Sequence, residues 1–392
     1  MTYKQEVSNT PSGAIIIEGH VQGLANVRAL GENGIPVYVV DKSCCIARYS
    51  KYCKKFYVCP DYKEDKLADF LIEIALNEGL RDWVLFPSND HAVITLTRNK
   101  ERLKPYYRFN ALDDDQLFQI YNKSELSDIA HKLNIPVPIK YKFNSIGSDS
   151  FFPLIIKGKI GLNFFRVFKK KAFVVNSYEA YLELLDFIQP KFKLEDLLIQ
   201  EFLPFNKNNR AVFCITFISN GEVKLHFMCQ RIREHPFRNG TSTVLKAIFY
   251  PEVLEYTKQL AKGIRSTGIY EFEYLYNSNQ KRFNLIEINP RTCIQIGLPV
   301  RLGCNFQMAF FLYWSSEEKV FECQDFTNAY WIHFWTDLFY GLWGFVKGEY
   351  TLKEILAPYR ARRPIFAVFD IKDISPFIME TVLLPYLKVK RT

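Results

Sequence analysis

The sequence contains no long hydrophobic run. None of its 392 residues lie in a stretch approaching the roughly 18–20 apolar residues that a membrane-spanning helix requires. The longest candidates, 211–218 and 308–314, have the lengths of a core strand and a core helix. The first ten residues are polar and lack the apolar core of a secretion signal. The sequence therefore predicts a cytoplasmic protein without a transmembrane segment.

Zinc-site, disulfide and dinucleotide signatures are also missing. The nine cysteines form no CxxC motif and have no spacing paired with histidine, so we expect reduced thiols. Gly19 and Gly23 do not complete a GxGxxG pattern, and no dinucleotide site is predicted.

Charge of one sign is not concentrated along the chain. The net charge is +9, but Lys and Arg are dispersed among 42 acidic residues. Small anionic substrates explain such a surplus as well as nucleic acid does, and we expect no nucleic-acid partner. Only residues 388–391 are locally basic; a solvated terminus explains them, with an anionic membrane surface as the weaker alternative.

The N-terminal part alternates apolar strands and helices. Strands are predicted at Gly13–Glu18, Val37–Val40 and Trp83–Phe86, with helices over about 24–33 and 65–78. This order is typical of a small doubly wound α/β unit.

Residues 268–291 predict a β-hairpin whose one face carries acids. Both strands alternate large apolar and polar side chains. If Asn277 pairs with Phe283 across the turn, Glu273 falls directly opposite Glu287.

Two opposed carboxylates and a nearby amide indicate a bound divalent cation. Glu273 and Glu287 would repel each other and raise each other's pKa unless a cation neutralised them. With Asn289 they form an oxygen-only set that suits Mg²⁺ completing its shell from water and phosphates. Arg291 follows and can offer a planar fork to an anionic group. The alternative is an exposed hairpin with solvated acids, which explains Glu271 well.

The run Glu-Ile-Asn-Pro-Arg, with an acid fourteen positions before its Glu, resembles the metal-binding end of the ATP-grasp enzymes. The resemblance implies that Glu273, Glu287 and Asn289 hold Mg²⁺ (or Mn²⁺) on the phosphates of ATP. It also implies that Arg291 is catalytic and faces the transferred phosphoryl group.

Further elements follow the family order upstream. Lys123 near the start of a helix, and Lys157 at the end of an apolar strand, resemble the lysines that reach the nucleotide phosphates. Residues 158–171 would form a flexible loop over the phosphates, although large aromatics stand where small residues are usual. On its own, Lys123 is an ordinary surface lysine.

The strand ending at residues 201–204 resembles the hinge against which adenine lies. The resemblance implies that Glu201 reads the base edge and that Phe202 and Leu203 supply backbone contacts. The alternative for Glu201 is a strand-end acid in solvent.

Two arginines precede a Gly-Thr-Ser run. Arg231, Arg233, Thr241 and Ser242 resemble the segment that faces the phosphoryl group and the carboxylate substrate, which implies that both arginines are catalytic. Acceptor contacts are expected at the carboxyl edge of the first domain. The candidates there are Arg28, Ser88, Asn89 and Asp90, for which helix capping or a surface role is at least as good an explanation.

The resemblance implies an α/β chain, with a doubly wound domain before a two-lobed α+β ATP-grasp domain. The expected limits are 1–115 for the first domain, 116–195 for the small lobe, 196–315 for the large lobe and 316–392 for a segment packed on it. The nearest likeness is to carboxylate–amine ligases, the subgroup that includes D-aspartate ligase.

The implied activity is amide formation through an acylphosphate, with release of ADP and phosphate. The expected partners are a small-molecule carboxylate, an amine and a second copy of the chain, and the substrate would be an amino acid or a cell-envelope precursor. The alternatives are carboxylation or carbamoyl transfer on the same fold, and a non-catalytic ATP-binding protein.

Overall fold

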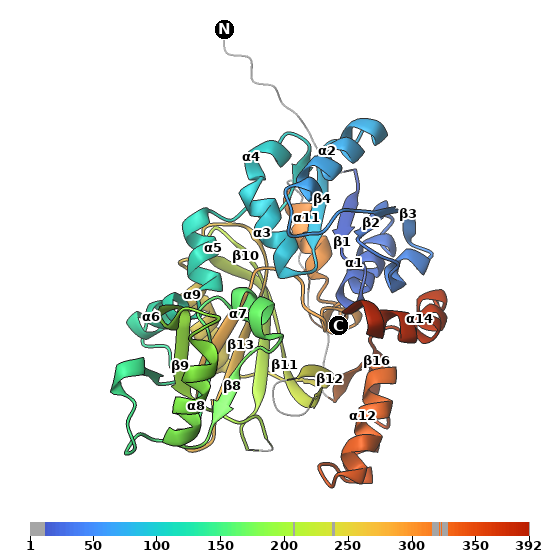
Figure 1. The fold of residues 1–392 in the computed structure, drawn as a ribbon. Coiled ribbons are helices and arrows are strands. Elements are labelled where there is room, and N and C mark those ends of the chain that lie inside the picture. Colours follow the sequence, from blue (N-terminus) through green and yellow to red (C-terminus); the bar gives the residue numbers. More distant parts are fainter. Residues whose placement is uncertain are drawn as a thin grey trace.

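The computed structural model describes residues 12–206, 208–236, 240–315, 321, 323 and 328–391. The polar N-terminal segment, residues 1–11, lies outside the described residues. The strands form three sheets, of five, seven and four strands. In Figure 1 the five-stranded sheet lies at the upper right and the four-stranded sheet at the lower left.

The N-terminal sheet is parallel throughout and has the order β3-β2-β1-β4-β5. Its strands are β1 (Ala14–Ile17), β2 (Val37–Asp41), β3 (Cys53–Val58), β4 (Trp83–Pro87) and β5 (Tyr107–Arg108). Its helices are α1 (Val21–Gly31), α2 (Lys66–Glu78), α3 (Asp90–Arg98) and α4 (Lys100–Leu103). Every residue of β1 is buried, as expected for a strand covered on both faces. The predicted doubly wound unit is confirmed.

At the carboxyl edge of this sheet, a short turn connects β4 to α3. β1 lies between β2 and β4, so the strand order reverses there, and ligands of open α/β sheets bind at such points. Residues 88–90 follow β4, and the Asn89 side chain caps α3 by accepting from the backbone N–H of Ala92 at 2.8 Å.

The four-stranded sheet is antiparallel and has the order β6-β9-β7-β8. Its strands are β6 (Lys140–Tyr141), β7 (Leu154–Gly158), β8 (Phe173–Val175) and β9 (Leu197–Glu201). Helices α7 (Gly161–Phe168) and α8 (Tyr178–Ile188) pack with this sheet, whereas α5 (Asp114–Tyr121) and α6 (Lys123–Lys132) pack against the seven-stranded sheet.

Helix α7 corrects the prediction of a flexible loop over residues 158–171. The stretch forms two helical turns because Phe164 and Phe168 enter an aromatic core, while Phe165 remains 47% exposed. Phe164 is fully buried and packs against Phe168, Phe173 and Phe192.

The seven-stranded sheet has the order β14-β13-β10-β11-β12-β15-β16. Its strands are β10 (Ala211–Ser219), β11 (Glu222–His235), β12 (Thr241–Ala247), β13 (Gly268–Asn277), β14 (Arg282–Asn289), β15 (Ala329–Ile332) and β16 (Arg363–Phe366). The helices after β12 are α9 (Pro251–Ala261), α10 (Gly297–Arg301), α11 (Phe306–Tyr313), α12 (Phe334–Val346), α13 (Leu352–Leu356) and α14 (Ser375–Arg391). Short 3₁₀ turns occupy Ile46–Tyr49, Phe143–Ser145 and Leu194–Asp196.

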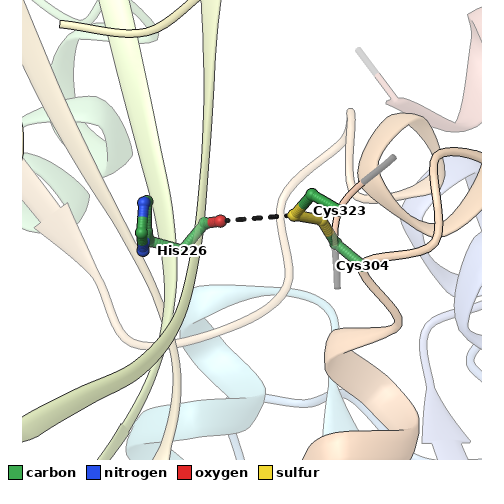
Figure 2. Close-up of a disulfide and its surroundings, with 3 residues drawn as sticks. All are labelled: His226, Cys304 and Cys323. Atoms are coloured by element: carbon green, nitrogen blue, oxygen red, sulfur yellow. Dashed lines mark hydrogen bonds between the residues drawn. A yellow bond between two sulfur atoms is a disulfide. The ribbon is translucent and has the colours of Figure 1, made fainter. Parts of the chain in front are cut away.

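One cysteine pair corrects the expectation of reduced thiols. Cys304 and Cys323 form a disulfide with their Cα atoms 4.9 Å apart. Figure 2 shows the pair beside β11, where Cys323 Sγ lies 3.7 Å from the carbonyl oxygen of His226. No sequence spacing marks this pair, because its members meet only through the packing of the loop before α11 near β11. The other seven cysteines are free.

Candidate active site

Strands β13 and β14 bring the two predicted carboxylates together. Glu273 pairs directly with Glu287 across the antiparallel ladder, as the sequence predicts. Nearer the turn the register differs from the prediction, because a shift directly after Glu273 pairs Asn277 with Arg282 instead of Phe283. Such a bulge places one extra residue in one strand, and alternation alone does not reveal it.

The carboxylates of this hairpin are held in unlike charge environments. Burial raises the pKa of Glu273 to about 7, despite the nearby charge of Arg231. The charge of Lys123 holds the pKa of Glu287 well below its usual range. A buried carboxylate with a raised pKa lacks sufficient counter-charge, which a divalent cation would supply. Across the described ranges no three His, Cys, Asp or Glu side chains form a metal cluster, so a cation would use two carboxylates and the Asn289 amide oxygen.

Glu271 is not the solvated acid that the sequence suggests. Its side chain is buried, and it accepts hydrogen bonds from Asn289 Nδ2 at 3.0 Å and from the side-chain amide of Gln295. Because the Asn289 amide nitrogen is directed at Glu271, its oxygen is directed the other way, and Arg291 Nη2 donates to it at 3.4 Å. The sequence gives no sign of Gln295, which the turn after Pro290 returns to the sheet.

Two lysines lie beside this hairpin. Asn122 caps α6 and thereby sets Lys123 at its first position, where the ammonium forms an ion pair with Glu287. Burial, together with the nearby charge of Lys123, lowers the pKa of Lys157 to about 7. Lys123 therefore carries a positive charge beside the paired acids, and Lys157 gains one when it is protonated.

Lys157 predicts a pH-dependent signature of nucleotide binding. Phosphate oxygens favour the charged lysine and so raise its pKa from about 7, and ATP binding at pH 8 is expected to take up nearly one proton. Isothermal titration calorimetry in two buffers of different ionisation enthalpy measures this uptake. Lys157→Met should abolish it and Lys142→Met, at an exposed lysine of the same lobe, should not; equal uptake in both variants would contradict the assignment.

Arg291 is tied to the first domain. Its guanidinium forms a bidentate pair with Asp90, with Nε–Oδ1 at 2.8 Å and Nη2–Oδ2 at 3.0 Å. Tyr121 donates to the same carboxylate at 3.0 Å. Burial alone would lower the pKa of Arg291, but the charge of Asp90 holds it above its usual range. The carboxyl edge of β4 and the Asn-Pro-Arg turn therefore meet, over 200 residues apart in the chain.

The other acceptor candidates have structural partners. Ser88 is fully buried, and Asn89 caps α3. Arg28 is buried and donates to the carboxylate of Asp373 at 2.9 Å and to two backbone carbonyls, so it ties α1 to the start of α14. Of the four candidates, only Asp90 bonds directly to the hairpin motif.

Arg231 lies at the hairpin. Its guanidinium donates to Glu273 at 3.4 Å, to Glu234 at 3.1 Å and to Ser242 Oγ at 3.0 Å. Ser242 therefore positions Arg231, whereas Thr241 is exposed and pairs with His235 at the end of the ladder.

Arg233 points elsewhere. It is 2% exposed and pairs through Nε and Nη2 with both oxygens of Asp337 in α12, at 2.8 and 2.6 Å. It also donates to the backbone carbonyl of Glu354. Residues two apart on a regular strand share a face, but the ladder shifts register between Arg231 and Arg233. Arg233 is therefore directed at Asp337 and not at the acids of the hairpin, unlike the prediction for both arginines.

The predicted hinge residues contact the segments just before β6 and β7. The Glu201 carboxylate accepts from the backbone N–H of Ile139 at 3.0 Å, and the Phe202 N–H donates to Pro153 at 3.0 Å. Glu201, Phe202 and Leu203 are all partly exposed. The hinge acid thus braces the linker into β6 and is not simply in solvent.

The chain has the ATP-grasp fold. N5-carboxyaminoimidazole ribonucleotide synthetase, solved as an ADP complex, aligns with a TM-score of 0.63 at 15% identity, covering 86% of this chain and 86% of that one. L-Amino acid ligase from Bacillus licheniformis aligns with a TM-score of 0.59 at 13% identity, covering 79% and 76%. The predicted fold class is thereby confirmed.

A curated relative supports the same resemblance. D-Aspartate ligase of Enterococcus faecium (strain Aus0004) is 20% identical over 262 residues, which are 62% of this chain and 62% of that protein. The match thus spans less than two thirds of the relative's length. No protein-family model matches the sequence.

Proposed function

We propose that the protein is an ATP- and Mg²⁺-dependent carboxylate–amine ligase that forms an amide and releases ADP and phosphate. The observation that carries the proposal is the hairpin pair Glu273 and Glu287, with Asn289 beside it. A positive side chain stands near each part of this set: Lys123, Lys157, Arg231 and Arg291. The likeness to D-aspartate ligase supports an amino acid or a cell-envelope precursor as substrate.

The nucleotide would lie between the two lobes. Lys123 and Lys157 would hold its phosphates, and residues 201–203 would lie along the base. When bound, Mg²⁺ on Glu273, Glu287 and Asn289 would neutralise phosphate charge. Lys123 would then exchange Glu287 for phosphate oxygens, because the metal takes over the neutralisation of that carboxylate.

The chain's own residues would act by position and charge. A substrate carboxylate oxygen attacks the γ-phosphorus, the bond to the β–γ bridging oxygen breaks, and ADP leaves. Arg231 and Arg291 flank the acids and would stabilise negative charge on the phosphoryl group in transfer.

A neutral amine then attacks the acyl carbon, and inorganic phosphate leaves as the proton passes from nitrogen to solvent. Asp90 already holds Arg291 at the carboxyl edge of β4, which suits binding of the amine on that side. Arg233 and Arg28 have no part in this proposal, since both are buried in other pairs.

The test is Mg²⁺-dependent ADP release by the full chain, screened over pools of carboxylic acids and amines. We expect one acid–amine pair to stimulate turnover and to yield the amide by mass spectrometry. Stimulation by bicarbonate without an amine would instead show carboxylation. ATP binding without turnover in any pool would show a non-catalytic nucleotide-binding protein.

A further inference from the structure

Helix α12 is built with its small residues inside and its large apolar residues outside. Asp337, Gly341 and Gly344, spaced four and three residues apart, are buried and face the molecule. Phe339, Leu342, Trp343 and Val346 form a second stripe at helical spacing and are 57, 47, 52 and 76% exposed. An ordinary surface helix has the opposite arrangement.

The exposed stripe continues beyond one helix. Trp335 stacks on Phe339 with ring centroids 6.1 Å apart, and Leu352 of α13 is 51% exposed. Figure 1 shows α12 projecting from the body of the molecule at the lower right. Contiguous exposed apolar side chains of this size mark an interaction surface, because leaving them in water is unfavourable.

The charges around the stripe identify its partner. Lys347 lies 5.0 Å from the Trp343 ring centre, and positive charge is in excess among the exposed side chains that follow, which are Glu349, Lys353, Arg360 and Arg362. Asp337, the acid inside α12, is neutralised by Arg233. A second copy of this face would bring like charges together, whereas an anionic lipid surface complements them.

The length of the helix restricts how it can meet lipid. Across the described part of the chain, no helix is long and apolar enough to cross a membrane. The 13 residues of α12 span about 20 Å, short of the roughly 30 Å hydrocarbon core. Tryptophan and phenylalanine beside lysine are the side chains that settle at the headgroup boundary.

We propose that α12 docks the protein in the plane of an anionic phospholipid surface. Phe339, Leu342, Trp343 and Val346 enter the boundary between headgroups and acyl chains, and Lys347 and Lys353 contact lipid phosphates. The proposal rests on this surface alone and does not depend on the proposed ligase activity.

The test is cosedimentation of the full chain with phosphatidylcholine vesicles, with and without about 30% phosphatidylglycerol. The anionic lipid supplies the negative surface that attracts Lys and Arg side chains. We expect binding to the anionic vesicles, weakened by salt, and a loss of roughly 100-fold in the variant Phe339→Ser/Trp343→Ser. The control variant is Val58→Ser/Leu76→Ser, at two aliphatic side chains that are 64 and 65% exposed elsewhere.

Three outcomes would overturn the proposal. They are no binding to anionic vesicles, equal binding by the two variants, and a wild-type dimer that the α12 variant converts to monomer without any vesicle binding. The last would show that a second copy covers the stripe. Unchanged thermal unfolding midpoints confirm that both variants are folded.

Discussion

Glu287→Gln is expected to lower ADP release by roughly 10³-fold, equivalent to about 4 kcal/mol of transition-state stabilisation. The carboxylate is the partner of Glu273 across the hairpin and of Lys123 at the start of α6. Glutamine keeps the shape and removes the charge, so Mg²⁺ loses one of two anionic ligands. The measurement is kcat for Mg²⁺-dependent ADP release with the acid–amine pair found in the screen.

Glu183→Gln provides the matched control, because Glu183 is exposed on α8, away from the hairpin. It should turn over at the wild-type rate. Glu183→Gln should unfold at the wild-type temperature, and turnover by Glu287→Gln is measured well below its own unfolding midpoint, because that change also removes the ion pair with Lys123. Near-normal turnover by Glu287→Gln would remove the metal assignment while leaving the fold untouched.

Arg233→Ala is expected to lower the free energy of unfolding by about 3–5 kcal/mol. The substitution leaves Asp337 buried and without its bidentate partner, while Thr243 and Tyr359 still donate to it. α12 would then lose its main polar attachment to β11. Urea denaturation followed by tryptophan fluorescence measures the change.

Two variants separate this structural role from catalysis. Arg233→Met with Asp337→Leu should recover most of the stability, because an apolar pair of similar size removes the unpaired charge. Arg231→Lys should keep near-normal stability and lose turnover by roughly 10²-fold, since a bidentate guanidinium is not replaced by an ammonium. If Arg233→Ala instead kept its stability and lost turnover, Arg233 would belong to the reaction.

Alternation along the chain was sufficient to predict that Glu273 and Glu287 meet across a hairpin. Strict period-two patterns set which side chains share a face, so Glu273 and Glu287 could be placed opposite each other. The length of the loop between the strands could not be predicted, because a bulge changes the pairing of residues without changing the alternating pattern. The same limitation separated Arg231 from Arg233.

Burial could not be predicted for polar side chains with remote partners. Glu271 looked solvated because its partner Gln295 lies 24 residues onward, beyond a turn. Arg28 looked available because Asp373 is 345 residues away. Cys304 and Cys323 likewise carried no spacing signal.

The sequence by itself determined three strands and two helices of the first domain, the acidic hairpin and the order of the positive side chains. These depend on side-chain periodicity and short motifs, which are local properties of the chain. Only the tertiary structure decided which arginine faces the acids, what holds Asn289, and that Asp90 meets Arg291. Those outcomes depend on bulges and on contacts between distant elements, where packing and hydrogen-bond satisfaction override the local pattern.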